Sequence, residues 1–169
     1  MDETYAFTLN LGHQIDEKAR AAAANDNSPG AADFMRRRIM RELKPALDRL
    51  GLPLFWFALE ISPDGKLHIH GAIAARKHEI PAIEKALCRA GGAWTPVPGS
   101  SQVHTKRQFN AEGWFNYCDE DLAKTGRVID GPLFYIPDEL RRRARARYMA
   151  DRDELIEFLR GENQRRMRP

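Results

Sequence analysis

The chain has 169 residues, of which 43% are hydrophobic and 30% are charged, and its formal net charge is +3. This length suits one globular domain with a short appendage, and the composition excludes a disordered, collagen-like or low-complexity chain. No apolar run approaches the ~20 residues of a membrane span, and the N-terminus lacks a secretory pattern, so we expect a cytoplasmic protein with no membrane partner.

The first fifty residues change pattern twice. Thr4–Asn10 is short, aromatic and β-branched, which is typical of a first strand. Residues 12–30 hold an alanine patch followed by turn-forming residues, which indicates a fraying helix within a mobile insertion. Apolar side chains at helical spacing from Ala31 to Leu50 then predict an amphipathic helix.

A β-hairpin is the strongest local signal. Leu54–Ile61 and Lys66–Ala74 are strand-like runs on either side of a Pro-Asp-Gly turn. Proline presets φ at the first turn position, and glycine accepts the left-handed conformation that closes a three-residue loop. With Pro63–Gly65 as that loop, Ser62 faces Lys66.

This register places Glu60 opposite His68 and Ala58 opposite His70. Directly opposed residues share a face of the sheet, so the carboxylate and both imidazoles are expected to project together. Two histidines and a carboxylate are a recurrent divalent-metal set with open coordination positions. The opposite face of the hairpin is predicted to be core, through Phe55, Phe57, Leu59, Ile61, Leu67, Ile69 and Ile73.

The second half of the chain predicts one more strand and three helices. Ile80–Ala90 is helical in pattern and ends at two glycines, whereas Gln102–Gln108 alternates like a strand. Asn110 is a candidate N-cap for a helix that runs to about Lys124. A long last helix begins at Pro137 or Asp138.

Basic charge is concentrated at the C-terminus. Residues 141–169 carry ten arginines and five acidic residues, a balance of +5, so residues 1–140 carry −2. We therefore expect a domain over residues 1–136 and a basic helical extension over 137–169. Arginines attract phosphate, although an arginine-rich helix can also be a solvated face. The candidate phosphate contacts are Arg141, Arg142, Arg143, Arg145 and Arg147.

Three short motifs follow one another between residues 5 and 124. They are Phe7–Asn10 on the first strand, Leu67–Gly71 (LHIHG) on the hairpin, and Tyr117 within WFNYCDED on a predicted helix. In this order and placement they resemble motifs I, II and III of HUH endonucleases of the rolling-circle replication initiator class. Glu60 matches the upstream acidic ligand of the viral members.

The resemblance implies an α+β fold in which a ferredoxin-like central antiparallel sheet is packed with helices. It also implies metal-dependent nicking and rejoining of single-stranded DNA, which initiates rolling-circle replication of a plasmid, phage or virus. Tyr117 would attack the scissile phosphate to give a 5′-phosphotyrosine and a free 3′-OH. Glu60, His68 and His70 would hold Mn²⁺ or Mg²⁺.

The resemblance further implies partners and a location. The partners are single-stranded DNA, with a hairpin origin as one form, and a separate helicase. The location is the bacterial cytoplasm or the compartment of viral DNA replication. Thr8 and Asn10 are candidate DNA contacts or ordinary strand-end residues, and Lys106 is a candidate phosphate contact because it alternates with His104.

Motif III departs from the family pattern. The usual lysine, three or four residues after the tyrosine, is replaced by Glu120 and Asp121. Lys124 follows Tyr117 by two helical turns and shares its face, so it is a candidate catalytic residue that supplies the basic group at longer reach. Asp121 is alternatively a metal ligand, which leaves the third ligand open between it and Glu60.

Several alternatives remain open at this stage. One is a non-cleaving origin-binding or repressor protein of the same fold, motivated by the missing lysine. Another is a relaxase- or transposase-type nuclease with the same site chemistry. Tyr117 is otherwise a core aromatic that packs with Trp114.

Overall fold

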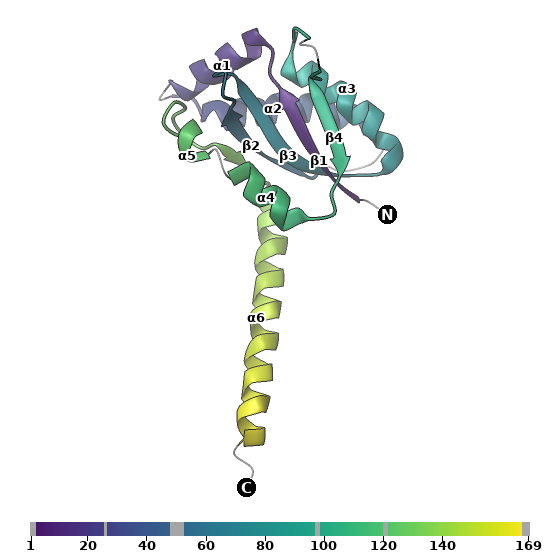
Figure 1. Ribbon diagram of the computed structural model, residues 1–169, viewed down its shortest axis with the longest axis vertical. Helices are drawn as coiled ribbons and strands as arrows, with labels where there is room; N and C mark the ends of the chain where they lie inside the picture. The colour runs from purple at the N-terminus through teal and green to yellow at the C-terminus, as the bar shows by residue number, and fades with distance from the viewer. Residues whose placement is uncertain (1–2, 26, 48–52, 97–98, 120–121, 167–169) are drawn as a thin grey trace. The chain divides into compact units, whose positions relative to one another are not determined.

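The computed structural model describes residues 3–25, 27–47, 53–96, 99–119 and 122–166. Five strands form one antiparallel sheet in the order β4-β1-β3-β2-β5 (Figure 1). The sheet is packed against helices, which confirms the expected α+β class and is consistent with a ferredoxin-like arrangement. The strands are β1 (Glu3–Asn10), β2 (Phe55–Ile61), β3 (Leu67–Ala75), β4 (Val103–Arg107) and β5 (Phe134–Tyr135).

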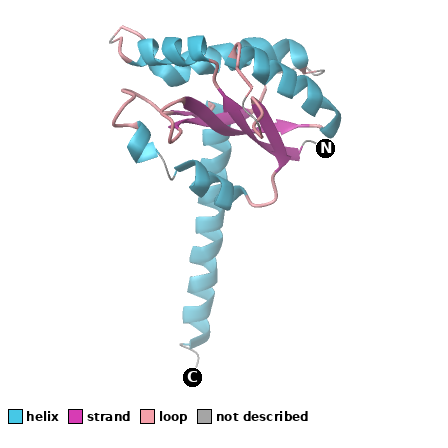
Figure 2. Cartoon of the chain, turned by 45° about the horizontal axis from the view of Figure 1, so that its top comes forward, coloured by secondary structure: helices cyan, strands magenta, loops and turns pink. Residues whose placement is uncertain are grey.

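Helices cover both faces of this sheet. Helices α1, α2 and α3 pack on one face and α4 lies on the other (Figures 1 and 2). The helical segments are α1 (His13–Ala23), α2 (Gly30–Leu43), η1 (Lys44–Ala46), η2 (Lys77–Glu79), α3 (Ile80–Gly91), α4 (Ala111–Asp119), α5 (Leu122–Thr125) and α6 (Asp138–Arg166).

The hydrophobic core lies between the sheet and helices α1 to α3. Ile15, Met35 and Ile83 are buried there, one from each helix. The strands contribute alternate residues because successive strand side chains point to opposite faces. Every hairpin residue expected in the core is buried: Phe55, Phe57, Leu59, Ile61, Leu67, Ile69 and Ile73.

The hairpin forms in the predicted register. Glu60 pairs with His68 and Ala58 with His70. At the turn, the Ser62 N–H donates to the Lys66 carbonyl at 2.9 Å, and Gly65 has φ 82°, the left-handed value that favours glycine. The turn chemistry therefore sets which side chains share a face.

Two sequence expectations need correction. The helix expected within residues 12–30 is present as α1 (His13–Ala23), but it belongs to the domain and not to an insertion, because Ile15 and Ala19 are buried in the core. The helix expected over Ala31–Leu50 ends as α-helix at Leu43 and passes into a 3₁₀ turn, in which Pro45 removes a backbone donor. The short strand β5 was not expected, since two residues carry no periodicity.

The chain divides into two compact units, Met1–Tyr135 and Ile136–Pro169. Within the second unit, Arg142 and Arg143 of α6 pair with Glu139 at 2.6 and 2.7 Å. In the part of the chain that the structure describes, no helix combines the length and the apolar character needed to cross a bilayer.

Helix α1 braces the turn of the hairpin. The buried Asp16 carboxylate accepts the Leu67 N–H at 3.2 Å and the Arg20 Nε–H at 2.5 Å. The same guanidinium donates to the Gly65 carbonyl at 2.6 Å. These contacts hold the start of β3, the strand that carries both histidines.

We expect Asp16→Ala to destabilise the protein by about 1–3 kcal/mol, because it leaves the buried Leu67 N–H without an acceptor. Urea unfolding followed by circular dichroism measures this loss. Glu17→Ala is the matched control, since Glu17 lies on the same helix with an exposed side chain. Equal stability of the two variants would contradict the bracing role of Asp16.

Candidate metal centre and active site

Three neighbouring strands bring the candidate ligands together. In one row across the sheet, Asn10 of β1 pairs with His68 of β3, which pairs with Glu60 of β2. In the next row, Thr8 pairs with His70. Directly paired residues share a face, so these five side chains project from the face opposite the core.

The ligand atoms converge closely. Glu60 Oε2 lies 3.7 Å from His68 Nε2 and 3.6 Å from His70 Nε2, and one ligand atom from each residue lies within 4.8 Å of the others. Glu60 and His70 are buried, whereas His68 is partly exposed. The group could therefore hold a metal ion.

Unused polar atoms support this assignment. Glu60 Oε1 and His68 Nδ1 are buried, and neither has a hydrogen-bond partner among the described residues. Buried polar atoms are nearly always satisfied, and leaving one unpaired costs free energy. A carboxylate that keeps an unpaired oxygen beside two imidazoles is a donor set that fits a divalent cation.

His70 is a neutral candidate ligand. Burial, and secondarily the charge of neighbouring His68, lowers the pKa of His70 to about 4. Its Nδ1 lies 2.9 Å from Thr8 Oγ1. In the tautomer that carries its proton on Nδ1, the ring donates to Thr8 and keeps the Nε2 lone pair directed at the Glu60 side.

Thr8→Val is therefore expected to weaken Mn²⁺ binding by about 10- to 100-fold, because the isosteric side chain cannot fix the ring of His70. Thr8→Ser should restore most of the affinity in isothermal titration calorimetry. Thr4→Val, an exposed threonine of the same strand, is the control. Wild-type affinity in Thr8→Val would show that Thr8 does not orient the imidazole.

Helix α4 places Tyr117 over this cluster. Asn110 caps the helix, since its Oδ1 accepts the Gly113 N–H at 2.9 Å. One turn on, the Trp114 indole N–H donates to the carbonyl of Gly71 in β3 at 3.0 Å. This hydrogen bond holds α4 against β3, the strand that carries both histidines.

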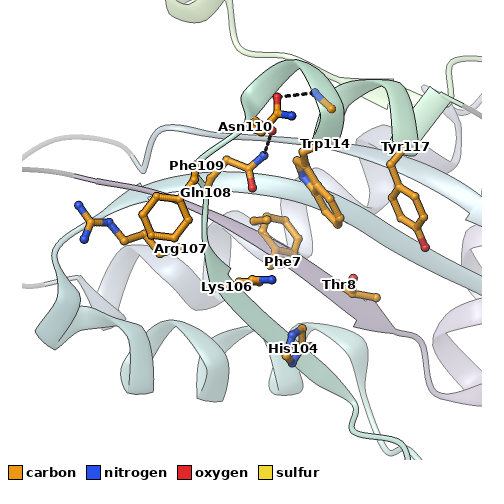
Figure 3. A pocket seen from close by; sticks show the side chains of 12 residues that line it. Phe7, Thr8, His104, Lys106, Arg107, Gln108, Phe109, Asn110, Trp114 and Tyr117 are labelled. Carbon is orange, nitrogen blue, oxygen red and sulfur yellow. Dashed lines mark hydrogen bonds between the residues drawn. The ribbon is translucent and has the colours of Figure 1, made fainter.

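The Tyr117 ring contacts the cluster directly. Its centroid lies 5.1 Å from that of His70 in an edge-to-face contact and 5.3 Å from that of Trp114 in a stacked one. The Tyr117 side chain projects from α4 toward the strand that carries Thr8 (Figure 3). Tyr117 is 52% exposed, so it is not a core aromatic.

The neighbouring thiol is not a competing nucleophile. Cys118 is fully buried, and burial together with the charge of Glu60 raises its pKa to about 12. A thiol of that pKa stays protonated at neutral pH and is unreactive. Of Tyr117 and Cys118, only Tyr117 is exposed to solvent.

An open cavity of about 410 Å³ lies over the cluster. It is lined by Thr8, Asn10, Glu60, Ser62, Pro63, His68, His70 and Tyr117. The structure therefore brings together, in one cavity, the three ligand candidates, the tyrosine and both motif I polar residues. Lys106 lines a second cavity that adjoins this one through Thr8 and Tyr117.

The remaining candidates lie elsewhere. Lys124 is exposed on α5 and does not line either of these two cavities. Asp121 lies outside the described residues. The five arginines of the basic segment are exposed on α6, in the second compact unit: Arg141, Arg142, Arg143, Arg145 and Arg147.

Some residues of the site were missed by sequence reasoning. Trp114 was noted only as a packing partner, although its indole N–H fastens α4 to β3. Phe109 was not singled out, yet it is 80% exposed at the rim of the second cavity. A phenylalanine between two polar residues, directly after a strand, is the signal that could have marked it.

Comparisons with known proteins do not assign this chain to a family. No family model, no curated protein and no solved structure matches the chain. A function is therefore inferred from the arrangement of the candidate ligands and Tyr117.

Proposed function

We propose that this protein is an HUH-type endonuclease and strand transferase that nicks and rejoins single-stranded DNA through Tyr117. One observation carries the proposal: a carboxylate and two imidazoles converge in an open cavity that a half-exposed tyrosine also lines. The order of the three sequence motifs agrees with this arrangement.

The proposed reaction is a transesterification. The Tyr117 Oη forms a bond to the scissile phosphorus and releases its phenolic proton to solvent or to a base. The bond from phosphorus to the 3′ oxygen breaks, and that oxygen takes up a proton to give a free 3′-OH. Because a phenolate is a better leaving group than an alkoxide, the covalent 5′-phosphotyrosine can be attacked by a 3′-OH and the strand rejoined.

Glu60, His68 and His70 would hold the divalent ion, which we propose to be Mn²⁺ or Mg²⁺. When bound, such an ion polarises a phosphate oxygen and neutralises charge that develops in the transition state. The chain's own contribution is to orient His70 through Thr8 and to hold Tyr117 through Trp114. Mixed nitrogen and oxygen ligands favour Mn²⁺ over Mg²⁺, which prefers oxygen alone.

The proposed biological role is initiation of rolling-circle replication, with single-stranded DNA as substrate and a separate helicase as partner. These 169 residues hold no GxxxxGK[ST] phosphate loop, and the helicase is part of the proposal.

The arginines of α6 are proposed to contact DNA phosphates, which predicts that the affinity of the protein for DNA falls as the salt concentration rises.

A second candidate function is a DNA-binding protein of the same fold that does not cleave. It is favoured by one observation, the position of Lys124, which lines neither of the two cavities around Tyr117. Such a protein would bind single-stranded DNA and form no covalent adduct.

Labelled oligonucleotides distinguish the two functions. The protein is incubated with Mn²⁺ and a random-sequence pool of single strands, and the products are separated on a denaturing gel. A 5′-phosphotyrosine carries the 3′ part of the strand, so a label at the 3′ end should migrate with the protein and a label at the 5′ end should not. Chelation of the metal with EDTA should abolish the adduct. Binding without any adduct would support the second function instead.

A further inference from the structure

A second cavity of about 480 Å³ lies along β1, β4 and the start of α4 (Figure 3). It shares the lining residues Thr8 and Tyr117 with the cavity over the ligand candidates, so the two cavities adjoin. We call it the Phe109 pocket. Its other lining residues are Ala6, Phe7, His104, Lys106, Arg107, Gln108, Phe109, Asn110, Gly113 and Trp114.

Phe109 is a large apolar side chain that is exposed to solvent. Its exposed fraction is 80%, the highest among the exposed large hydrophobic residues that the structure describes. The connection that carries it is fixed at both ends: the Gln108 N–H donates to the Thr4 carbonyl at 2.8 Å, and the Gln108 amide donates to the Asn110 carbonyl (Figure 3). The ring is therefore presented by an ordered segment.

The surroundings of the ring are cationic. The Arg107 guanidinium carbon lies 5.2 Å from the Phe109 ring centroid, and this arginine also pairs with Glu3 at 2.7 Å. Lys106 is exposed and pairs with Ala6 on β1, so it faces the same side of the sheet as Thr8. None of the described residues that line the pocket is acidic. An aromatic face with adjacent cations is the chemistry that binds bases and phosphates of single strands.

We propose that the Phe109 pocket binds a nucleobase of the single strand beside the scissile phosphate, stacked on the Phe109 ring, with a backbone phosphate near Lys106. This inference rests on the proposed function, because Tyr117 lines the pocket and its proposed attack on phosphorus determines which part of the DNA enters. A duplex is excluded as the occupant of the pocket, because its bases are already stacked on one another.

The test compares two probes of about 20 nucleotides, an oligo-dT and a strand of the same length in which every base is replaced by an abasic sugar. Fluorescence anisotropy in EDTA measures both affinities, so cleavage does not enter the result. The wild-type protein should prefer the base-bearing strand, and Phe109→Ala should reduce that preference by about 5- to 30-fold. Phe109→Trp should restore it. Phe158→Ala is the matched control, since Phe158 is exposed on α6.

The Phe109 pocket and the proposed cleavage at Tyr117 give independent results. An unchanged preference in Phe109→Ala overturns the stacking pocket, even if the protein forms the covalent adduct. A reduced preference supports the pocket, even if no adduct forms. An equal loss of affinity for both probes would assign Phe109 to the fold of the connection, and it also overturns the proposal.

Discussion

A Tyr117→Phe variant is expected to form no covalent adduct with DNA, with a loss of about 10³-fold or more relative to the wild type. The substitution removes the hydroxyl that would attack phosphorus and leaves the ring. Because the ring makes the contacts with His70 and Trp114, the position of α4 and the affinity for single-stranded DNA should change little. The adduct is measured on a denaturing gel with a 3′-labelled strand and Mn²⁺.

Tyr148→Phe is the control for this variant. Tyr148 is also exposed, but it lies on α6, in the other compact unit. Full adduct formation by Tyr148→Phe together with none by Tyr117→Phe would assign the nucleophile. An adduct that persists in Tyr117→Phe would show that a different residue attacks the phosphate.

The second large effect concerns the metal. His68→Ala and His70→Ala are each expected to weaken Mn²⁺ binding by about 100-fold or more in isothermal titration calorimetry, because each removes one of three ligands. Glu60→Gln should act in the same direction, since the amide keeps the size of the side chain and loses its charge. Cleavage should fall with metal affinity, whereas DNA binding measured in EDTA should largely remain.

His78→Ala is the matched control for the histidine variants, because His78 is exposed on η2. Melting temperatures show whether any variant has lost its fold, which matters most for Glu60 since it is 3% exposed. Folded His68→Ala and His70→Ala variants that bind Mn²⁺ like the wild type would falsify the ligand assignment.

The hairpin and its metal ligands could be predicted from the sequence because their geometry is local. The Pro-Asp-Gly turn restricts which residues face each other, and strand alternation then assigns Glu60, His68 and His70 to one side. The buried face followed from the same alternation. No contact between distant segments was needed for either prediction.

Helix boundaries and the N-terminal insertion were less predictable. Alanine-rich and turn-forming residues over 12–30 carry little periodicity, yet α1 is held by Ile15 in the core and by Asp16 at the hairpin turn. These partners lie far away along the chain. Burial against them stabilises a helix that local propensity leaves marginal.

The sequence by itself determined the ligand face of the hairpin, because a two-residue period and a tight turn leave one register. Only the tertiary structure decided what surrounds that face. The placement of β1 between β4 and β3 brings Thr8 to His70, and the Trp114 hydrogen bond to Gly71 brings Tyr117 within ring contact of His70. Both contacts join residues more than forty positions apart in the sequence. A local sequence pattern cannot predict them, because they form only when the whole sheet and its helices pack together.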